Sequence, residues 1–393
     1  MPSLVVNASP AHPLGMPSAD FLRDYWQKHP LLIRGAMAGL TCPLTPEDLA
    51  GLACEELALS RLVQHDRVND RWSLRQGPFA ETDFPGLPTQ DWTLLVQDVD
   101  KWDADVRQLL RGFDFIPRWR IDDVMVSFAA PGGSVGAHVD HYDVFLLQGQ
   151  GTRRWHIDAR KNPPLACRDD AELKLLREFN PSDEWLLEPG DMLYLPPGVP
   201  HHGIAVDACL TFSIGMRAPA VSELIGDLAD HLMDALPDSL RYGDADLAPP
   251  TDTNEIDATA IARVRQLLES NLALDDRALA TWLGGFLTRY RSSAESFSPP
   301  KAPTPAQIER ALGKGGCLVQ HPFARFAWTR AGRQARLFAH GHSWLLPLAA
   351  AKRLCAIQPI LATDYQHLCR QADTVISELL AAGLLVVQRK GSK

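Results

Sequence analysis

The sequence predicts an α+β protein whose first half is an antiparallel barrel or sandwich of short strands, with helices before and after it. Two observations support this fold class. From Ile121 onward, short runs of alternating apolar and polar residues are separated by Gly and Pro at turn positions, which is typical of antiparallel sheets. After about residue 220, apolar residues recur at three- and four-residue steps, which indicates helices.

Two helices are predicted near the N-terminus. The segment SADFLRDYW is amphipathic, and Ser18 or Asp20 is the expected N-cap because a short polar side chain can accept a hydrogen bond from the first turn. The segment TPEDLAGLAC has Thr45 at the N-cap position and Pro46 at the first helical position, where a missing N–H costs nothing. We therefore expect helices over residues 18–26 and 45–54.

Strands are predicted in the region that follows. The segments with the required alternation are DVMVSFAA, AHVDHYDVFLLQGQG, TRRWHID, DMLYLPPG and CLTFSIGMRAP. Their short length and close spacing predict one antiparallel domain. We assign residues 1–220 to it.

Residues 221–297 are predicted to form a helical region. Its periodic segments are Val221–Leu236, Ile261–Leu274 and RALATWLGGFLTRY. The region is richer in Leu, Ala and Trp than a linker requires, and we predict that it forms a homodimer. Packing within one chain is the alternative.

The C-terminal part, residues 298–393, is predicted to be a winged-helix-like domain. The Pro-rich segment Ser298–Pro305 is the expected linker. It is followed by a helix (TPAQIERALGKGG), a hairpin (FAWTRAGRQARLFAHG), two helices and a last strand, LLVVQ. Helices around a small hairpin are typical of winged helices.

Charge is unevenly distributed along the chain. The 39 Lys and Arg and 48 Asp and Glu give a net charge of −9. Residues 301–393 contain 13 basic and 4 acidic residues, about +9, so residues 1–300 carry about −18. An acidic first part disfavours contact with nucleic acid phosphates and would attract a basic partner. Simple solubility explains the charge about equally well.

The composition also excludes several classes of protein. No run of eighteen apolar residues predicts a transmembrane helix, and the N-terminus lacks the features of a secretory signal. Seven scattered cysteines without a C-x-x-C motif fit free thiols in a reducing cytoplasm better than disulfides or a cysteine zinc site. We therefore expect a cytoplasmic protein without membrane contact.

The segment GAHVDHYDVF holds the main candidates for chemistry. On a regular strand His138 and Asp140 project from the same face, and Val139 from the other. A histidine and a carboxylate on one face are two-thirds of the two-His, one-carboxylate set of non-haem Fe(II) oxygenases. The third ligand is expected in EPGDMLYLPPGVPHHGIAV. There His201 is favoured over His202 because it directly follows the Pro-Gly-Val-Pro turn.

These residues carry a resemblance to a known family. The chain resembles the JmjC family of Fe(II)/2-oxoglutarate oxygenases, and more closely its bacterial ribosomal oxygenase branch of cupin-like ribosomal protein hydroxylases. The similar segments are FLRDYWQKHPLLIRGA, WRIDDVMVSFAAPGGSVGAHVDHYDVFLLQGQGTRRW, EPGDMLYLPPGVPHHG and FSIGMRAP. The resemblance implies a double-stranded β-helix (jelly roll) with flanking helices, a helical dimerisation region and a C-terminal winged helix.

The resemblance also implies the cofactors and their contacts. Fe(II) is bound by His138, Asp140 and His201, and the reaction consumes 2-oxoglutarate and O2. Arginine suits a bidentate grip on the far carboxylate of 2-oxoglutarate. Of the alternating pair, Arg153 faces inward by family position, although strand register alone leaves Arg154 open. Ser127 resembles the hydroxyl-bearing position beside this cosubstrate.

The implied substrate is an arginine of large-subunit ribosomal protein sixteen, hydroxylated at its β-carbon. A guanidinium requires carboxylate and aromatic contacts, and Asp123 and Tyr142 are the candidates. A histidine of another ribosomal protein is the alternative substrate. A non-enzymatic regulator that joins a cupin to a winged helix is a further alternative, although nucleic acid binding is not expected.

Overall fold

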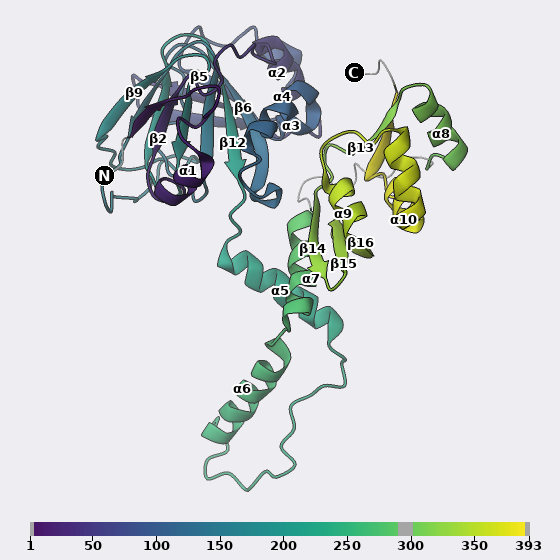
Figure 1. Ribbon diagram of the computed structural model, residues 1–393. Helices are drawn as coiled ribbons and strands as arrows, with labels where there is room; N and C mark the ends of the chain where they lie inside the picture. The colour runs from purple at the N-terminus through teal and green to yellow at the C-terminus, as the bar shows by residue number, and fades with distance from the viewer. Residues whose placement is uncertain (1–3, 290–301, 390–393) are drawn as a thin grey trace. The chain divides into compact units, whose positions relative to one another are not determined.

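The computed structural model describes residues 4–289 and 302–389. The chain divides into two compact units, Met1–Ala218 and Pro219–Lys393, and each is described by itself. Figure 1 shows the strands of the first unit and the helices and smaller sheets of the second. The predicted boundary between residues 297 and 298 lies outside the described residues. The division into three domains stays a prediction.

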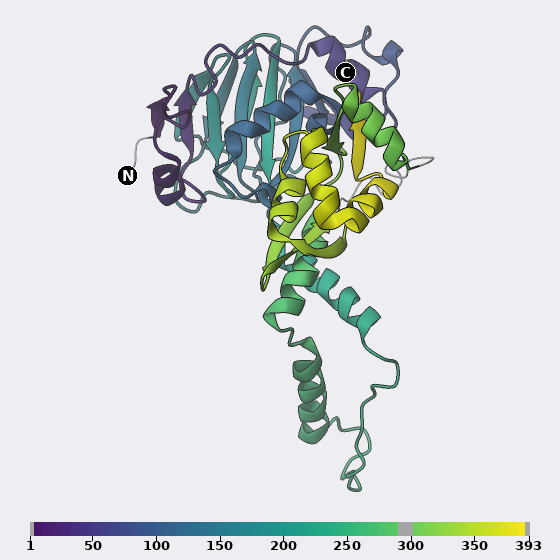
Figure 2. The ribbon, with the colours of Figure 1, turned by 45° about the vertical axis from the view of Figure 1, so that its right-hand side comes forward.

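The first unit is built on a nine-stranded sheet, whose strands lie side by side in Figure 2. Its order is β1-β2-β10-β7-β12-β6-β5-β3-β4. All the pairs are antiparallel except β1–β2. The strands are β1 (Val5–Asn7), β2 (Leu31–Arg34), β3 (Ser60–Asp66), β4 (Arg71–Gln76), β5 (Trp92–Val96), β6 (Ile121–Ala129), β7 (Val144–Gln150), β10 (Met192–Leu195) and β12 (Cys209–Met216).

A second sheet of three strands, in the order β11-β8-β9, packs against the first. Its strands are β8 (Arg153–Ile157), β9 (Asp183–Leu187) and β11 (His201–Ala205). The apolar layer between the sheets includes Val144, Leu146 and Leu193 of the large sheet and Trp155 and Ile157 of the small one. Two facing sheets, antiparallel apart from the β1–β2 pair, confirm the predicted α+β jelly roll.

Helices cover the other face of the large sheet. Alternate residues such as Phe145 and Phe212 pack there against Phe21 and Leu49 of the first two helices. The helical segments of this unit are α1 (Ser18–Asp24), α2 (Pro46–Ala53), α3 (Val99–Trp102), α4 (Ala104–Gln108), and the 3₁₀ turns Glu81–Asp83, Leu109–Phe113 and Arg118–Arg120. Both faces of the central strands β7, β10 and β12 are therefore buried.

The N-caps of the first two helices differ from each other. Thr45 caps α2 as predicted, and its hydroxyl accepts a hydrogen bond from the N–H of Asp48 at 3.2 Å. The predicted cap of α1 is wrong. Pro17 occupies the cap position without a side-chain bond, Ser18 is the first helical residue, and Asp20 instead accepts a bond from Arg23 at 2.6 Å.

The second unit begins with α5 (Val221–Ala235), α6 (Ala258–Leu272) and α7 (Asp276–Thr288). Helix α7 packs on the sheet of the winged helix so closely that a Cβ at Gly284 would lie 2.4 Å from the Phe338 ring. Asp227 of α5 accepts hydrogen bonds from Trp282 and Arg289 at 2.9 and 2.6 Å. Helices α5 and α7 are thus joined, whereas α6 has no buried residue.

The remaining elements form the predicted winged helix. The two sheets are β13–β17 and the meander β14-β15-β16, whose third strand was not predicted. The elements are α8 (Pro305–Gly313), β13 (Cys317–Gln320), β14 (Phe326–Ala331), β15 (Gln334–Ala339), β16 (His342–Pro347), α9 (Leu348–Cys355), α10 (Ala362–Ala381) and β17 (Leu385–Gln388). Within the described ranges, no helix is both long and apolar enough to cross a bilayer.

Candidate metal centre

The structure brings His138, Asp140 and His201 together. One ligand atom from each residue lies within 4.8 Å of the other two. His201 is the first residue of β11, and His138 lies opposite it in an isolated bridge. Asp140 lies between the imidazoles, 3.9 Å from Nε2 of His138 and 3.6 Å from Nε2 of His201. Two imidazoles and one carboxylate at this spacing suit Fe(II) and leave coordination positions open.

Hydrogen bonds orient both imidazoles. Nδ1 of His138 donates to the Gly136 carbonyl at 3.0 Å, and Nδ1 of His201 donates to the Val199 carbonyl at 2.9 Å. Each Nε2 is then the nitrogen that offers a lone pair to a metal. Burial, helped by the neighbouring His138, lowers the pKa of His201 to about 4. His201 is therefore neutral at pH 7, as a ligand must be.

The expected strand through GAHVDHYDVF is wrong before Val144, where β7 begins. Gly136 has a left-handed backbone with φ +79°, and His138 makes only the isolated bridge. The Asp140 carbonyl accepts a bond from the N–H of Gly198 at 2.9 Å, so this end of the segment pairs with the turn before β11. His138 and Asp140 meet because the loop is held at both ends, not because of strand alternation.

His202 lies on the opposite face of β11 from His201. His201 pairs with Ile157, whose side chain lies in the layer between the sheets. The His202 ring lies beside His156 and Phe179, with ring centroids 6.3 and 6.1 Å away. The structure thus places His201, and not His202, beside the other two ligands.

Arg153 is buried on the same face of the small sheet as His201, whereas Arg154 is half-buried on the other face and pairs with Glu184. The Trp155 ring lies between the arginine and the histidine. It is 5.7 Å from the Arg153 guanidinium carbon and 5.8 Å from the His201 ring, centroid to centroid. A Cβ at Gly203 would lie 2.7 Å from this indole, so only a glycine at position 203 leaves room for the ring.

The buried Arg153 guanidinium has atoms without a partner. Nε and Nη2 make no hydrogen bond to any described residue, and neither does Nε1 of Trp155. A buried cation without a counter-charge is costly, and a carboxylate ligand would remove that cost. Ser127 is also buried, on β6, where it pairs with Thr211 of β12. The donor set therefore fits a dicarboxylate cosubstrate.

Asp123 and Tyr142 lie near the ligands. Burial, together with the charges of Asp98 and Asp122, raises the pKa of Asp123 to about 7. Burial of the Tyr142 hydroxyl and the nearby charges of Asp140 and Asp123 raise the pKa of Tyr142, although 41% of the whole residue is exposed. An acidic group and a partly exposed aromatic ring thus adjoin the Asp140 side of the site.

Asp143 is a residue whose role sequence reasoning missed. On a regular strand Asp143 would project away from Asp140, into a turn or an outer salt bridge. It is instead completely buried on the helix-covered face. Its carboxylate accepts hydrogen bonds from Tyr194 at 2.6 Å, Gln27 at 2.9 Å and Arg120 at 3.3 Å. These bonds hold the C-terminal end of the ligand-bearing loop.

Comparisons with known proteins agree with this site and fold. Residues 108–224 match the JmjC domain model, and residues 266–386 match the ROXA-like winged helix model. A third model, the AraC-like ligand binding domain, matches residues 181–293. The fold and the site thus define a JmjC-domain Fe(II)/2-oxoglutarate oxygenase.

Similar whole proteins narrow this class to a family. Ribosomal protein uL16 3-hydroxylase of Escherichia coli is 36% identical over 77% of this chain and 79% of its own length. A probable ribosomal oxygenase of Haemophilus influenzae is 38% identical over 64% of this chain and 63% of its own. The structure of the Escherichia coli ribosomal oxygenase YcfD with cobalt and 2-oxoglutarate superposes with a TM-score of 0.81 at 31% identity, covering 95% of this chain and 99% of that one. The chain belongs to the bacterial ribosomal oxygenase family.

Proposed function

We propose that this protein hydroxylates the β-carbon of an arginine in ribosomal protein uL16. The observation that carries the proposal is the joint presence, between two facing sheets, of the His138, Asp140 and His201 set and of an Arg153 guanidinium whose Nε and Nη2 have no hydrogen-bond partner among the described residues. This combination suits a metal and a dicarboxylate at one site. The similarity to the Escherichia coli ribosomal protein uL16 3-hydroxylase supports the class of substrate.

The cofactors are Fe(II), 2-oxoglutarate and O2. Together they supply the oxidation that places one oxygen atom on a C–H carbon, while 2-oxoglutarate becomes succinate and carbon dioxide. In this proposal His138, Asp140 and His201 hold the metal, and Arg153 holds the far carboxylate of 2-oxoglutarate. Ser127 adds a hydroxyl near the cosubstrate, and Trp155 fills the layer between Arg153 and His201.

Asp123 and Tyr142 bind the substrate guanidinium in this proposal. Asp123 is held in place by the N–H of Asp98, which donates to its carboxylate at 3.1 Å. A Cβ at Gly215 would lie only 3.2 Å from the carboxylate, so the glycine keeps the space beside this oxygen open. A guanidinium in that space would neutralise the carboxylate, and the Tyr142 ring offers a face for stacking.

The partner is a basic ribosomal protein, and the negative charge of the first 300 residues would speed its approach. Such a substrate places the enzyme in the cytoplasm.

We further propose a homodimer through the helical region. Ile261, Val264, Leu268 and Leu272 follow three- and four-residue steps on α6, and each is at least 45% exposed. An apolar stripe of this kind is typical of a helix that packs against a partner.

The proposal is tested with the purified protein, Fe(II), 2-oxoglutarate and peptides of uL16. We expect a gain of one oxygen on one arginine, located by fragmentation mass spectrometry, with succinate formed in equal amount. A gain on a histidine of another ribosomal protein would replace the substrate but keep the reaction. If ribosomal extract also gave no succinate, a non-enzymatic regulator would be the better explanation.

A further inference from the structure

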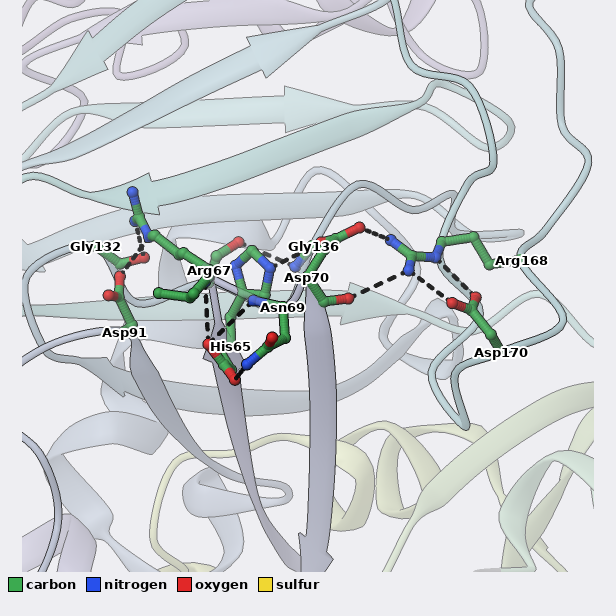
Figure 3. A network of polar contacts seen from close by, with 12 residues as sticks. His65, Arg67, Asn69, Asp70, Asp91, Gly132, Gly136, Arg168 and Asp170 are labelled. Atoms are coloured by element: carbon green, nitrogen blue, oxygen red, sulfur yellow. Dashed lines mark hydrogen bonds and ion pairs between the residues drawn. The ribbon is translucent and has the colours of Figure 1, made fainter.

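Two segments far from His138 in the sequence enclose the glycine-rich turn that carries it. One is the hairpin of β3 and β4, whose tip is residues 67–70. The other is the loop between β8 and β9, residues 158–182. Figure 3 shows Arg168 of this loop between Asp70 of the hairpin and Asp170.

Arg168 is the link between the two segments. Its Nη1 donates to Oδ2 of Asp70 at 2.7 Å, and its Nη2 donates to the Asp70 carbonyl at 3.3 Å. The same guanidinium binds Asp170 with two bonds, at 2.9 and 2.8 Å. We call the contact across the two segments the Asp70–Arg168 clasp. The Asp70 carboxylate is ionised because hydrogen bonds from His65 and Arg168 lower its pKa.

The hairpin side of the clasp extends to the turn through aromatic rings. Nε2 of His65 lies 3.0 Å from Oδ1 of Asp70, and its ring stacks on Trp72 with centroids 3.9 Å apart. A Cβ at Gly136 would lie 3.3 Å from the far edge of the Trp72 indole. Arg67 of the same hairpin donates to the Gly132 carbonyl at 3.0 Å. The hairpin therefore contacts both ends of the turn, Gly132 and Gly136.

The loop side reaches the same turn through its backbone. The Arg168 N–H donates to the Leu175 carbonyl, and the next N–H, that of Leu176, donates to the Ala137 carbonyl, both at 2.8 Å. A Cβ at Gly136 would lie only 2.4 Å from Leu175. Both segments thus meet at Gly136 and Ala137, directly before the ligand.

Gly136 is also the residue that orients the ligand, because its carbonyl accepts the bond from Nδ1 of His138 at 3.0 Å. We propose that Asp70 and Arg168 are positioning residues for His138: the clasp fixes Gly136 between Trp72 and Leu175 and so fixes the imidazole. This inference rests on the proposed role of His138 as a metal ligand. Neither residue belongs to the His138, Asp140 and His201 set, and the clasp acts through the backbone of the turn.

The effect concerns geometry more than stability. The side chain of Asp70 is 63% exposed, and exposed ion pairs contribute little to the free energy of unfolding. Residues that orient a ligand histidine typically change metal affinity about 10- to 100-fold when replaced. Since the clasp acts one contact further away, about a three- to tenfold loss is expected.

The test compares Asp70→Asn and Arg168→Gln with a matched control, Arg177→Gln. Arg177 pairs with Asp169 within the same loop at 2.7 Å, so its ion pair does not join the loop to the hairpin. Two measurements are made: Co(II) affinity, from the visible absorption of the bound ion, and amide hydrogen exchange of residues 131–140 in the metal-free protein. We expect weaker Co(II) binding and faster exchange in both clasp variants, and neither change in the control. The double variant should lose no more affinity than the stronger single one, because the residues act as a unit.

Unchanged affinity and exchange in both clasp variants would overturn the inference. Equal changes in Arg177→Gln would also overturn it, since the loop as a whole would then be responsible. Failure of the unsubstituted protein to bind Co(II) would contradict the proposed metal centre instead. In that case hydrogen exchange of the metal-free protein would still decide whether the clasp holds the turn.

Discussion

His138 and His201 each donate their backbone N–H to the carbonyl of the other at 3.0 Å. Their imidazoles lie with centroids 4.3 Å apart and planes at 61°. The bridge joins an irregular loop to the first residue of β11. Two ligands from distant parts of the chain are therefore positioned by a single pair of backbone bonds.

His201→Ala is expected to abolish Co(II) binding and Fe(II)-dependent turnover, because it removes the most buried of the three ligands. His202→Ala should keep both within about threefold, since this ring lies on the other face of β11. Titration with Co(II) and a succinate assay check the two variants. The opposite result would exchange the assignment of the two histidines.

Arg153→Lys is expected to raise the KM for 2-oxoglutarate by about 10- to 100-fold, because an ammonium cannot reproduce a bidentate grip on a carboxylate. Arg154→Lys is the matched control, since Arg154 pairs with Glu184 on the exposed face. The KM is measured from succinate formation at saturating peptide. An unchanged KM in Arg153→Lys would mean that another residue holds the cosubstrate.

The apparent affinity for an arginine peptide is expected to rise as pH passes through about 7 and to level off roughly one unit higher. Burial raises the pKa of Asp123 to about 7, so the carboxylate becomes an anion that can pair with a guanidinium only as pH passes this value. Peptide KM measured from pH 6 to 8.5 checks this. Asp123→Asn should bind weakly at every pH and show no such rise. A variant that retained the pH dependence would exclude Asp123 as its source.

The raised pKa of Asp123 also makes a prediction for stability. A carboxyl group that ionises near pH 4 when unfolded but near 7 when folded binds more protons in the folded state between these values. Its contribution to the free energy of unfolding therefore falls as pH rises from about 4 to 7. Asp123→Asn should remove this contribution, so the variant should lose less thermal stability than the parent between pH 5 and 8. An identical pH dependence in the two proteins would contradict the shift.

Leu268→Glu is expected to convert the proposed dimer to a monomer, because it places a charge within the apolar stripe of α6. Gln266→Glu, about half a turn away on the same helix, introduces the same charge outside the stripe and should leave the dimer intact. Sedimentation equilibrium at micromolar concentration distinguishes the species. A parent protein that is already monomeric would contradict the dimer itself.

The fold class was predictable because apolar residues recur every second position in the strands and every three or four positions in the helices, and short segments are enough to show this. The loop around His138 was misassigned as a strand because alternation also occurs by chance in a loop whose polar residues are ligands. The role of Asp143 was missed for another reason: its burial depends on helices that are distant in the sequence and that cover this face of the sheet. A polar residue on that face therefore needs partners such as Tyr194 and Arg120.

The contacts that hold the site were not predictable from local patterns. Asp70 and Arg168 are 98 positions apart, and nothing in either segment marks them as a pair. Arg153 and Arg154 are consecutive residues of β8 and point to opposite faces of the strand. The turn before them makes it impossible to tell from the sequence which of the two faces inward. The position of the small sheet, which the sequence does not encode locally, decides which arginine is buried.

The close approach of Trp155 to Gly203 has a consequence for related sequences. The indole occupies the volume that a side chain at position 203 would need, and it adjoins the His201 ring. Positions 155 and 203 should therefore covary: where a relative has a larger residue in place of the glycine, it should have a smaller one in place of the tryptophan.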